Sequence, residues 1–234
     1  MSVDAPLPVG PALPRWRARP RPPRTPIIGR SCRLEPLDAA RHAAALHAAY
    51  GADAAGRGWT YLPYGPFADE VAFRSWVEEM ARQDDPLFFA IVDPSGNPIG
   101  MASYLRIAPA AGSIEVGHIH YAPALQRTRA ATEAMYLMMR RAFDELGYRR
   151  YEWKCDDLNA ASLRAADRLG FVYEGTFRQH TVYKGRSRDT AWYSIIDTDW
   201  PAVRRVFEAW LDPANFDERG RQRTPLRAGG RAAP

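Results

Sequence analysis

The sequence predicts an α/β fold: a mixed, mostly antiparallel central sheet with helices on both faces. A β-type run, Ile114 to Tyr121, crosses a short turn at Pro123 into a strongly periodic helix that extends to Leu146. A second run, 148–155, alternates apolar and polar residues as a half-covered strand does. Strand, helix and strand in this order predict a right-handed parallel crossover at the centre of the sheet.

The segments before this crossover are predicted to form three strands and two helices. In chain order we expect a strand at 33–37, a helix at 38–50, a helix at 69–83, and strands at 87–92 and 98–107. Asp38 is a suitable N-cap for the first helix. The second helix carries a broad apolar face, and the turn at 93–97 joins the two strands as a hairpin.

The elements after the crossover complete the domain. A short amphipathic helix follows Asn159 and ends at Gly170, which is placed as a C-terminal cap. Strands at 177–183 and 190–196 are predicted to form a hairpin. A closing helix begins near Pro201, since proline is favoured in a first helical turn.

Length and composition predict one domain with two arms. A chain of 234 residues that is 46% hydrophobic can bury one good core. We expect a Pro/Arg-rich flexible arm at 1–30, the domain at 31–211 and a basic flexible tail at 212–234. The net charge of +5 and the pI near 9.4 suit an anionic ligand, but much of the excess lies in the two arms. Solvated arms are favoured over arms that contact nucleic acid or an acidic partner.

Several classes of protein are disfavoured. The two cysteines, Cys32 and Cys155, are too few for a disulfide scaffold. Neither belongs to a CxxC motif or lies near a His-rich segment, so we expect no metal site. Cys155 is interpreted as a small core residue rather than a nucleophile. The sequence has no apolar stretch long enough to cross a bilayer and no secretory h-region, so we expect a cytoplasmic protein without a membrane partner.

The turn after the central strand predicts an anion site. A strand that leads directly into a helix N-terminus presents unpaired N–H groups and the positive dipole end together. Arg127 and Arg129 add two guanidinium groups at this turn. We expect a bound phosphate here; the alternative is an ordinary connection with solvated arginines.

With the segment after Asp156, this turn resembles the GNAT superfamily of acyl-CoA-dependent N-acyltransferases. The resemblance is greatest to its branch of ribosomal-protein N-terminal acetyltransferases. It spans roughly 33–211, and several weak motifs in the right order carry it. The matching residues are Glu115, Gly117, Gln126, 131–134, Asn159, Ser162, 169–171, Gly175, 184–186 and Asp189.

The resemblance implies acetyl-CoA as co-substrate, a primary amine as acceptor, and no metal. In this family two neighbouring strands part to admit the pantetheine arm, and the pyrophosphate lies over the following helix. The cofactor-binding residues so implied are Ile119, Tyr121, Gln126, Arg127, Thr128, Arg129, Ala130, Ala131, Thr132, Asn159 and Ser162. Asn159 is also a candidate N-cap, and it can serve both roles.

The chain departs from the family pattern at two places. Arg129 occupies the principal glycine position of the Q-x-x-G-x-A motif, and Arg127 stands where many relatives have another glycine. A strained residue costs on the order of 1–3 kcal/mol, and a charge-assisted phosphate contact returns about 1.5–3 kcal/mol. Ala166 replaces a tyrosine that protonates the leaving thiolate in many relatives. An acid must therefore come from elsewhere, or the thiolate leaves without help.

Three residues are candidates for the general base. The resemblance implies direct attack by a neutral amine on the thioester. Glu115 is the first candidate, acting through water. His118 and His120 are rivals because an ordinary histidine pKa lies near neutrality. Strict alternation puts both histidines opposite Glu115, so all three line one cleft only if the strand bulges; otherwise they are plain sheet surface.

The acceptor side and the activity itself stay open. The aromatic loop 59–67 is either an acceptor wall or core packing, and the 183–188 turn with Asp189 is either pocket wall or solvated turn. We predict an N-acetyltransferase acting on a peptide N-terminus, an amino acid or a small amine, with a homodimer left open. The alternative is a non-catalytic acyl-CoA-binding or protein-interaction member of the same fold. Nucleic acid is disfavoured, because no face interleaves basic and aromatic residues.

Overall fold

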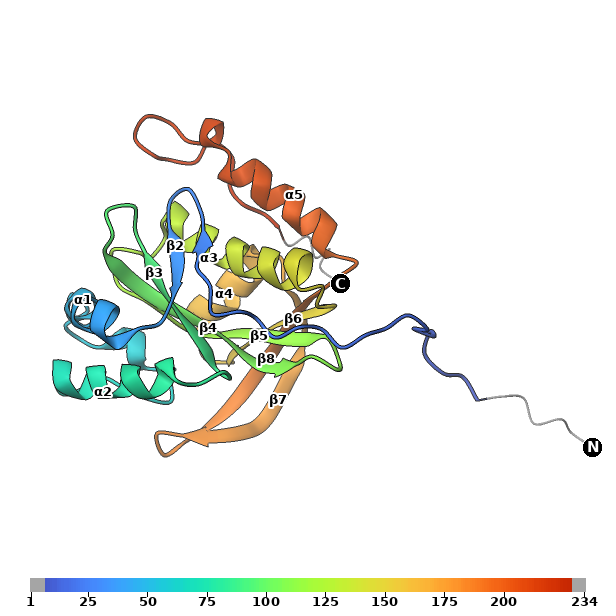
Figure 1. Ribbon diagram of the computed structural model, residues 1–234, viewed down its shortest axis with the longest axis horizontal. Helices are drawn as coiled ribbons and strands as arrows, with labels where there is room; N and C mark the ends of the chain where they lie inside the picture. The colour runs from blue at the N-terminus through green and yellow to red at the C-terminus, as the bar shows by residue number, and fades with distance from the viewer. Residues whose placement is uncertain (1–6, 229–234) are drawn as a thin grey trace, which may run out of the picture.

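An eight-stranded sheet forms the centre of the molecule, in the order β1-β2-β3-β4-β5-β6-β8-β7 (Figure 1). The computed structural model describes residues 7–228. The strands are β1 (Ile27–Ile28), β2 (Arg33–Pro36), β3 (Leu87–Val92), β4 (Pro98–Ala108), β5 (Ser113–Tyr121), β6 (Arg150–Asp156), β7 (Val172–Tyr183) and β8 (Arg186–Ile196). Strands β5 and β6 run parallel and the other neighbours antiparallel, so the predicted fold class is confirmed.

Helices cover both faces of the sheet. The first face carries α1 (Ala39–Gly51) and α2 (Glu70–Ala81), connected through the short 3-10 helix η1 (Arg57–Trp59). The opposite face carries α3 (Arg129–Arg140), α4 (Ala160–Arg168) and α5 (Trp200–Leu211), followed by η3 (Pro213–Asn215). The helix predicted to extend to Leu146 changes after Arg140 into a π-helical turn, η2 (Arg141–Glu145). Helices on two faces create two separate cores.

Strand β3 illustrates how both cores are filled. All six of its residues are buried. Phe89 and Ile91 enter the core under α3, whereas Phe88 and Ala90 enter the core under α1 and α2. A strand covered on both faces has a continuous run of apolar residues in its sequence. The predicted bounds of β3 therefore match the structure.

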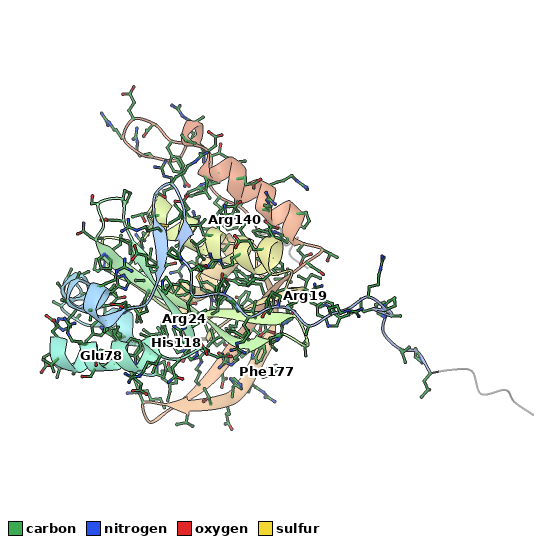
Figure 2. The ribbon with its side chains drawn as sticks, in the orientation of Figure 1. Arg19, Arg24, Glu78, His118, Arg140 and Phe177 are labelled. Atoms are coloured by element: carbon green, nitrogen blue, oxygen red, sulfur yellow. The ribbon has the colours of Figure 1, made fainter. Side chains whose placement is uncertain are left out.

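The last hairpin is longer than predicted. Strands β7 and β8 begin at Val172 and Arg186 rather than at 177 and 190. Strand β7 lies at the sheet edge and is mostly exposed, so it lacks the apolar alternation that would have marked its start. Figure 2 shows Phe177 on this hairpin, which extends away from the body of the domain.

Both chain ends contribute to packing. Trp16 donates from Nε1 to the carbonyl oxygen of Ala110 at 2.8 Å, and Arg24 donates to that of Ala81 at 2.8 Å. At the other end, Leu226 is buried in the core with α5. Residues 1–6 and 229–234 of the two predicted arms lie outside the described residues. Within residues 7–228, no helix has the length and apolar composition of a membrane span, and no three His, Cys, Asp or Glu side chains are grouped to hold a metal ion.

A buried carboxylate ties α3 to the β1–β2 turn. Glu133, only 6% exposed, accepts from the backbone N–H of Arg30 at 2.8 Å and of Ser31 at 2.6 Å, and from the Ser31 hydroxyl. These are charge-assisted bonds away from solvent. The α3 helix is thereby fixed against the first strands of the sheet.

Replacing Glu133 with alanine should lower the free energy of unfolding by about 2–4 kcal/mol, because two backbone donors lose a charged acceptor. Urea unfolding measures this loss. Glu78→Ala is the matched control, since Glu78 lies exposed on α2 (Figure 2) and should change the free energy of unfolding by less than about 0.5 kcal/mol. Equal effects of the two substitutions would contradict the role of Glu133.

Candidate active site

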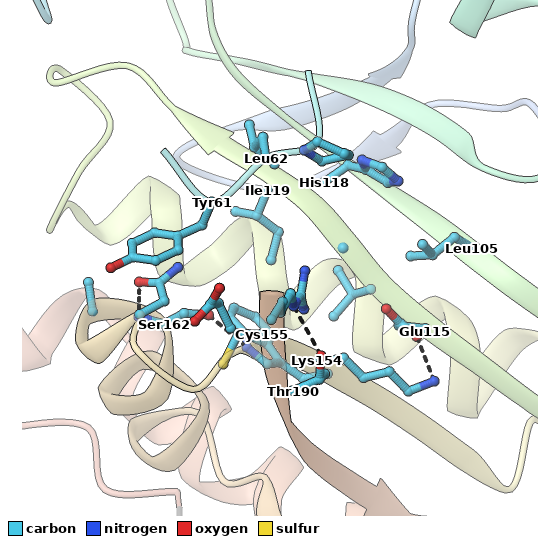
Figure 3. A pocket seen from close by; sticks show the side chains of 18 of the residues that line it. Tyr61, Leu62, Leu105, Glu115, His118, Ile119, Lys154, Cys155, Ser162 and Thr190 are labelled. Atoms are coloured by element: carbon cyan, nitrogen blue, oxygen red, sulfur yellow. Dashed lines mark hydrogen bonds and ion pairs between the residues drawn. The ribbon is translucent and has the colours of Figure 1, made fainter. Parts of the chain in front are cut away.

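The parallel strands at the centre of the sheet separate part-way along their length. Strands β5 and β6 pair from Ser113 and Arg150 up to Val116 and Trp153, where the pairing ends. Beyond this point β5 remains paired with β4, and β6 remains paired with β8. A cavity of about 710 Å³ opens at the separation. Figure 3 shows Ile119 of β5 and Cys155 of β6 on its opposite walls.

A β-bulge in β5 accompanies the separation. Gly117 lies opposite Ser103 and His120 opposite Met101, so two residues of β5 face one residue of β4. His118 has a φ of 50°, a conformation that non-glycine residues rarely adopt. The bulge brings His118 to the same side of the strand as Glu115, and both side chains line the cavity (Figure 3).

Glu115 is a buried carboxylate between two cations. It is 3% exposed; its Oε1 lies 2.7 Å from Arg106 Nη1 and its Oε2 lies 2.9 Å from Lys154 Nζ. Burial raises the pKa of this carboxyl, and the positive charges of Lys154 and Arg106 partly oppose the rise. A carboxylate with a raised pKa is a better proton acceptor near neutrality than an exposed one.

Arg106 reaches Glu115 from a second bulge, in β4. Its φ is 46°, and the β4–β5 register shifts between Leu105 and Ala108. The two carboxylate oxygens of Asp85 accept from the backbone N–H groups of Arg106 and Ile107 at 2.8 and 2.9 Å. Asp85 thus stabilises the conformation that directs the guanidinium of Arg106 toward Glu115.

Three neighbouring groups stabilise the positive charge of the Lys154 side chain. Its side chain is 6% exposed, and Nζ lies 2.7 Å from Glu152 Oε2 as well as 2.9 Å from Glu115. Nζ also lies 3.7 Å from the centre of the Trp192 ring, a cation–π contact. The charge of Lys154 is therefore committed to neighbours within the protein.

The two candidate histidines have different surroundings. His118 lines the cavity, with Nδ1 3.1 Å from the Tyr64 hydroxyl. His120 instead stacks on Tyr50 at 4.0 Å between ring centres and meets the edge of Trp59. Burial lowers the pKa of each histidine to about 4. Both rings are neutral at pH 7 and accept protons poorly, which leaves Glu115 as the stronger candidate base.

The turn into α3 offers backbone donors. Thr128 caps the helix and accepts from the N–H of Ala131 at 3.1 Å, whereas the N–H groups of Arg129 and Ala130 have no acceptor within residues 7–228. Arg127 has a φ of 61°, so it occupies the left-handed conformation that glycine favours. Arg129 is already helical, and its guanidinium lies 4.8 Å from the ring centre of Phe216. Of the two substituted glycine positions, Arg127 is the strained one.

The predicted cofactor-binding residues divide into two groups. Those that line the cavity are Ile119, Gln126, Asn159 and Ser162. Those outside its lining are Tyr121, Arg127, Thr128, Arg129, Ala130, Ala131 and Thr132. Asn159 is the N-cap of α4 and accepts from the N–H of Ser162 at 3.1 Å, so its capping role is confirmed. The Ser162 hydroxyl accepts from Trp153 Nε1 at 3.0 Å.

The aromatic loop and the last hairpin both contribute to the lining of the cavity. Tyr61 and Leu62 line it, whereas Trp59 and Phe67 pack into the core under α1 and α2. Core packing is thus confirmed for part of the loop, and an acceptor wall stays a prediction for the part that lines the cavity. Lys184 Nζ donates to the carbonyl oxygen of Trp59 at 2.8 Å and joins hairpin to loop.

Several cavity residues were not predicted from the sequence. They are Arg57, Arg106, Lys154, Asp156 and His180. For Lys154, the alternation of residues 148–155 indicated on which face of the sheet its side chain lies. The others depend on pairings between distant segments, and no local pattern marks them. Arg188 also lines the cavity, and it ends the 183–188 turn that was predicted as either pocket wall or solvated turn.

Comparison with known proteins decides the family. A family model for the acetyltransferase (GNAT) domain matches residues 32–172. The chain belongs to the GNAT acetyltransferase family. This membership supports N-acetyltransferase activity in general, and the predicted resemblance is confirmed.

Solved and curated relatives agree with this assignment. A GCN5-related N-acetyltransferase from Brucella melitensis is 48% identical with a TM-score of 0.89, covering 92% of this chain and 97% of that one. The SPbeta prophage-derived uncharacterized N-acetyltransferase YokL of Bacillus subtilis (strain 168) is 29% identical over 119 residues, 50% of this chain and 64% of that protein. RimL, a ribosomal L7/L12 alpha-N-protein acetyltransferase, shares the fold with a TM-score of 0.64 and 20% identity, covering 73% and 93% of the two chains.

The neutral histidines should make the fold sensitive to mild acid. Between a folded pKa of about 4 and the ordinary value of 6.5, the unfolded chain binds a proton that the folded chain excludes. Stability is therefore lost as the pH falls through this window, by about 2 kcal/mol per histidine at pH 5. His120→Gln should reduce by about 2 kcal/mol the loss between pH 7 and pH 5 in urea unfolding. An unchanged loss would show that His120 does not titrate as inferred.

Proposed function

We propose that this protein transfers an acetyl group from acetyl-CoA to a primary amine by direct attack. The observation that carries the proposal is the position of Glu115, a buried carboxylate that opens onto the cavity where β5 parts from β6. Family membership supplies the reaction class. Acetyl-CoA contributes a thioester carbonyl as electrophile and a thiolate as leaving group.

The residues around the separation fit this co-substrate. Beyond Val116, β5 has no neighbouring strand on its β6 side within residues 7–228, so its backbone donors and acceptors on that side are available to an extended arm. The free N–H groups at Arg129 and Ala130 begin α3 and suit a phosphate. The two features flank the short β5–α3 connection, the first before it and the second after it.

The proton that the amine loses is taken up by a residue of the protein, Glu115. The attacking amine must be neutral, which at pH 7 costs about 4.6 kcal/mol for a lysine-like amine and about 1 kcal/mol for an α-amine. As the new C–N bond forms and the C–S bond breaks, the nitrogen loses its proton to Glu115, directly or through water. Position 166 is an alanine, which has no ionisable group, so no side-chain acid at that position assists the thiolate.

A non-catalytic acyl-CoA-binding protein is the second candidate. The alanine at position 166 favours it, because the family's usual proton donor is missing there. The cation pair around Glu115 favours catalysis, because a carboxylate kept ionisable in a buried site has a direct use as a base.

Acetyl-CoA should stabilise the protein and be consumed. At about a hundred times its dissociation constant it should add roughly 2.7 kcal/mol to the free energy of unfolding. Thermal unfolding with acetyl-CoA, followed by mass spectrometry against a panel of amines, measures both. A stabilised protein without any acetylated product would favour the binding-only candidate, and no stabilisation would exclude both.

Glu115→Gln should lower kcat more with a high-pKa amine than with a low-pKa amine. A loss on the order of 10³-fold in kcat is expected with a high-pKa amine and about 10-fold with a low-pKa amine, because the base matters most where deprotonation is costly. Steady-state kinetics at one pH with both amines measures the difference, and thermal unfolding verifies the fold of the variant. Glu78→Gln, on the exposed face of α2, is the control. Equal losses with the two amines would exclude Glu115 as the base.

A further inference from the structure

The cavity walls carry more positive than negative charge. Among the described residues, the cationic side chains in the lining are Arg57, Arg106, Lys154 and Arg188, and the acidic ones are Glu115 and Asp156. The two nearby histidines do not offset this surplus, because His118 is neutral at pH 7 and His180 carries no negative charge in either form. The cavity therefore favours a ligand with negative charge.

Both acidic side chains already have partners. Glu115 is paired with Arg106 and Lys154. Asp156 accepts from the N–H of Leu158 at 2.9 Å and from the Tyr183 hydroxyl at 2.8 Å. The donors to Asp156 are uncharged, so the surplus remains that of four cations over two carboxylates. Arg106 and Lys154 are paired with Glu115, which leaves Arg57 and Arg188 as the lining cations to consider.

Neither of these two arginines has a carboxylate partner within residues 7–228, although ion pairs are frequent elsewhere in the same residues. Arg188 is held by one nitrogen, since Nε donates to the Thr190 hydroxyl at 3.0 Å and the guanidinium lies 5.7 Å from the ring centre of Tyr183. Its two terminal nitrogens thus keep their donors for a ligand. Arg57 begins η1, on the loop that Lys184 joins to the hairpin.

The alternation of β8 places Arg188 on the face of the sheet that α1 and α2 cover. Ala191 and Tyr193 are buried in the core under α3 and α4, so Arg188, Thr190 and Trp192 point to the opposite face. Lys154 contacts Trp192 on that face and also pairs with Glu115. Arg57 belongs to the connection between α1 and α2, which covers the same face. The start of α3, where a cofactor phosphate fits, belongs to the other layer.

We infer that the acceptor carries a carboxylate close to its amine and that Arg57 and Arg188 bind this carboxylate. The inference rests on the proposed function and narrows its acceptor to an α-amine: a free amino acid or a peptide with an acidic first residue. Guanidinium groups pair with carboxylates through two parallel hydrogen bonds. A positive wall also disfavours ammonium ions, which keeps a bound amine neutral for attack and excludes polyamines.

Pairs of acceptors of similar size that differ by one negative charge test the inference. One pair is two C-terminally amidated tetrapeptides that differ only in a first residue of aspartate or asparagine; the other is alanine and alaninamide. The carboxylate member of at least one pair should have a kcat/KM about 10- to 100-fold higher, and the pair that responds identifies the source of the carboxylate. Arg57→Gln and Arg188→Gln should each reduce that preference by about 10-fold or more.

The controls separate this inference from its rivals. Arg164→Gln, an exposed arginine of α4 outside the cavity, should leave the preference unchanged. A preference for the uncharged member of both pairs, or faster acetylation of a diamine, overturns the inference and leaves the proposed transfer standing. If the arginine variants raise the KM for acetyl-CoA equally with all acceptors, the arginines bind the co-substrate and the inference is wrong.

A binding measurement tests the inferred carboxylate site even if no acceptor is acetylated. Calorimetric titration of the acidic and neutral acceptors into protein saturated with CoA measures the charge preference at equilibrium. A carboxylate preference that Arg188→Gln removes, without any acetylated product, would contradict the proposed transfer but support the anionic site. Equal affinities for all four acceptors would overturn the site itself.

Discussion

The separation of β5 from β6 after Val116 and Trp153 is the constraint on which the rest of the structure depends. Each strand keeps its outer neighbour, β4 for β5 and β8 for β6, so the sheet opens internally without losing its edges. An opening of this kind leaves backbone groups without sheet partners, which is costly unless a ligand or water satisfies them. The positive φ of His118, at the bulge beside the opening, is a second local cost.

The buried charge of Glu115 depends on the residues behind its two cations. Arg106 is directed toward it by a bulge that the Asp85 carboxylate holds, and Lys154 is placed by Glu152 and the Trp192 ring. Removing one member of such a buried group leaves another charge uncompensated, which costs several kcal/mol. The carboxylate is therefore fixed in position and yet, with its raised pKa, still able to gain and lose a proton.

Local patterns predicted those features that local forces determine. Strand β3 was recognisable because both of its faces are apolar, and the cap at Gly170 because its φ of 93° suits glycine. The contact of the Arg129 guanidinium with the Phe216 ring was not predicted, because the segment after α5 folds back in a way that no local pattern in the sequence marks; a phosphate role for Arg129 stays a prediction. Arg106 was missed because strand register, set by a distant pairing, brings it to the cavity, whereas Arg188 ends the 183–188 turn that the sequence marked as a possible pocket wall.

The two layers of helices also separate the steps of the proposed reaction. Glu115, Lys154 and Arg188 belong to the face that α1 and α2 cover, whereas the start of α3 and the buried Ala166 belong to the other face. In the proposed reaction, Glu115 therefore takes up the amine proton on the face that α1 and α2 cover. Position 166 lies on the other face, so the alanine there removes the family's usual assistance to the thiolate and leaves the proposed base unaffected.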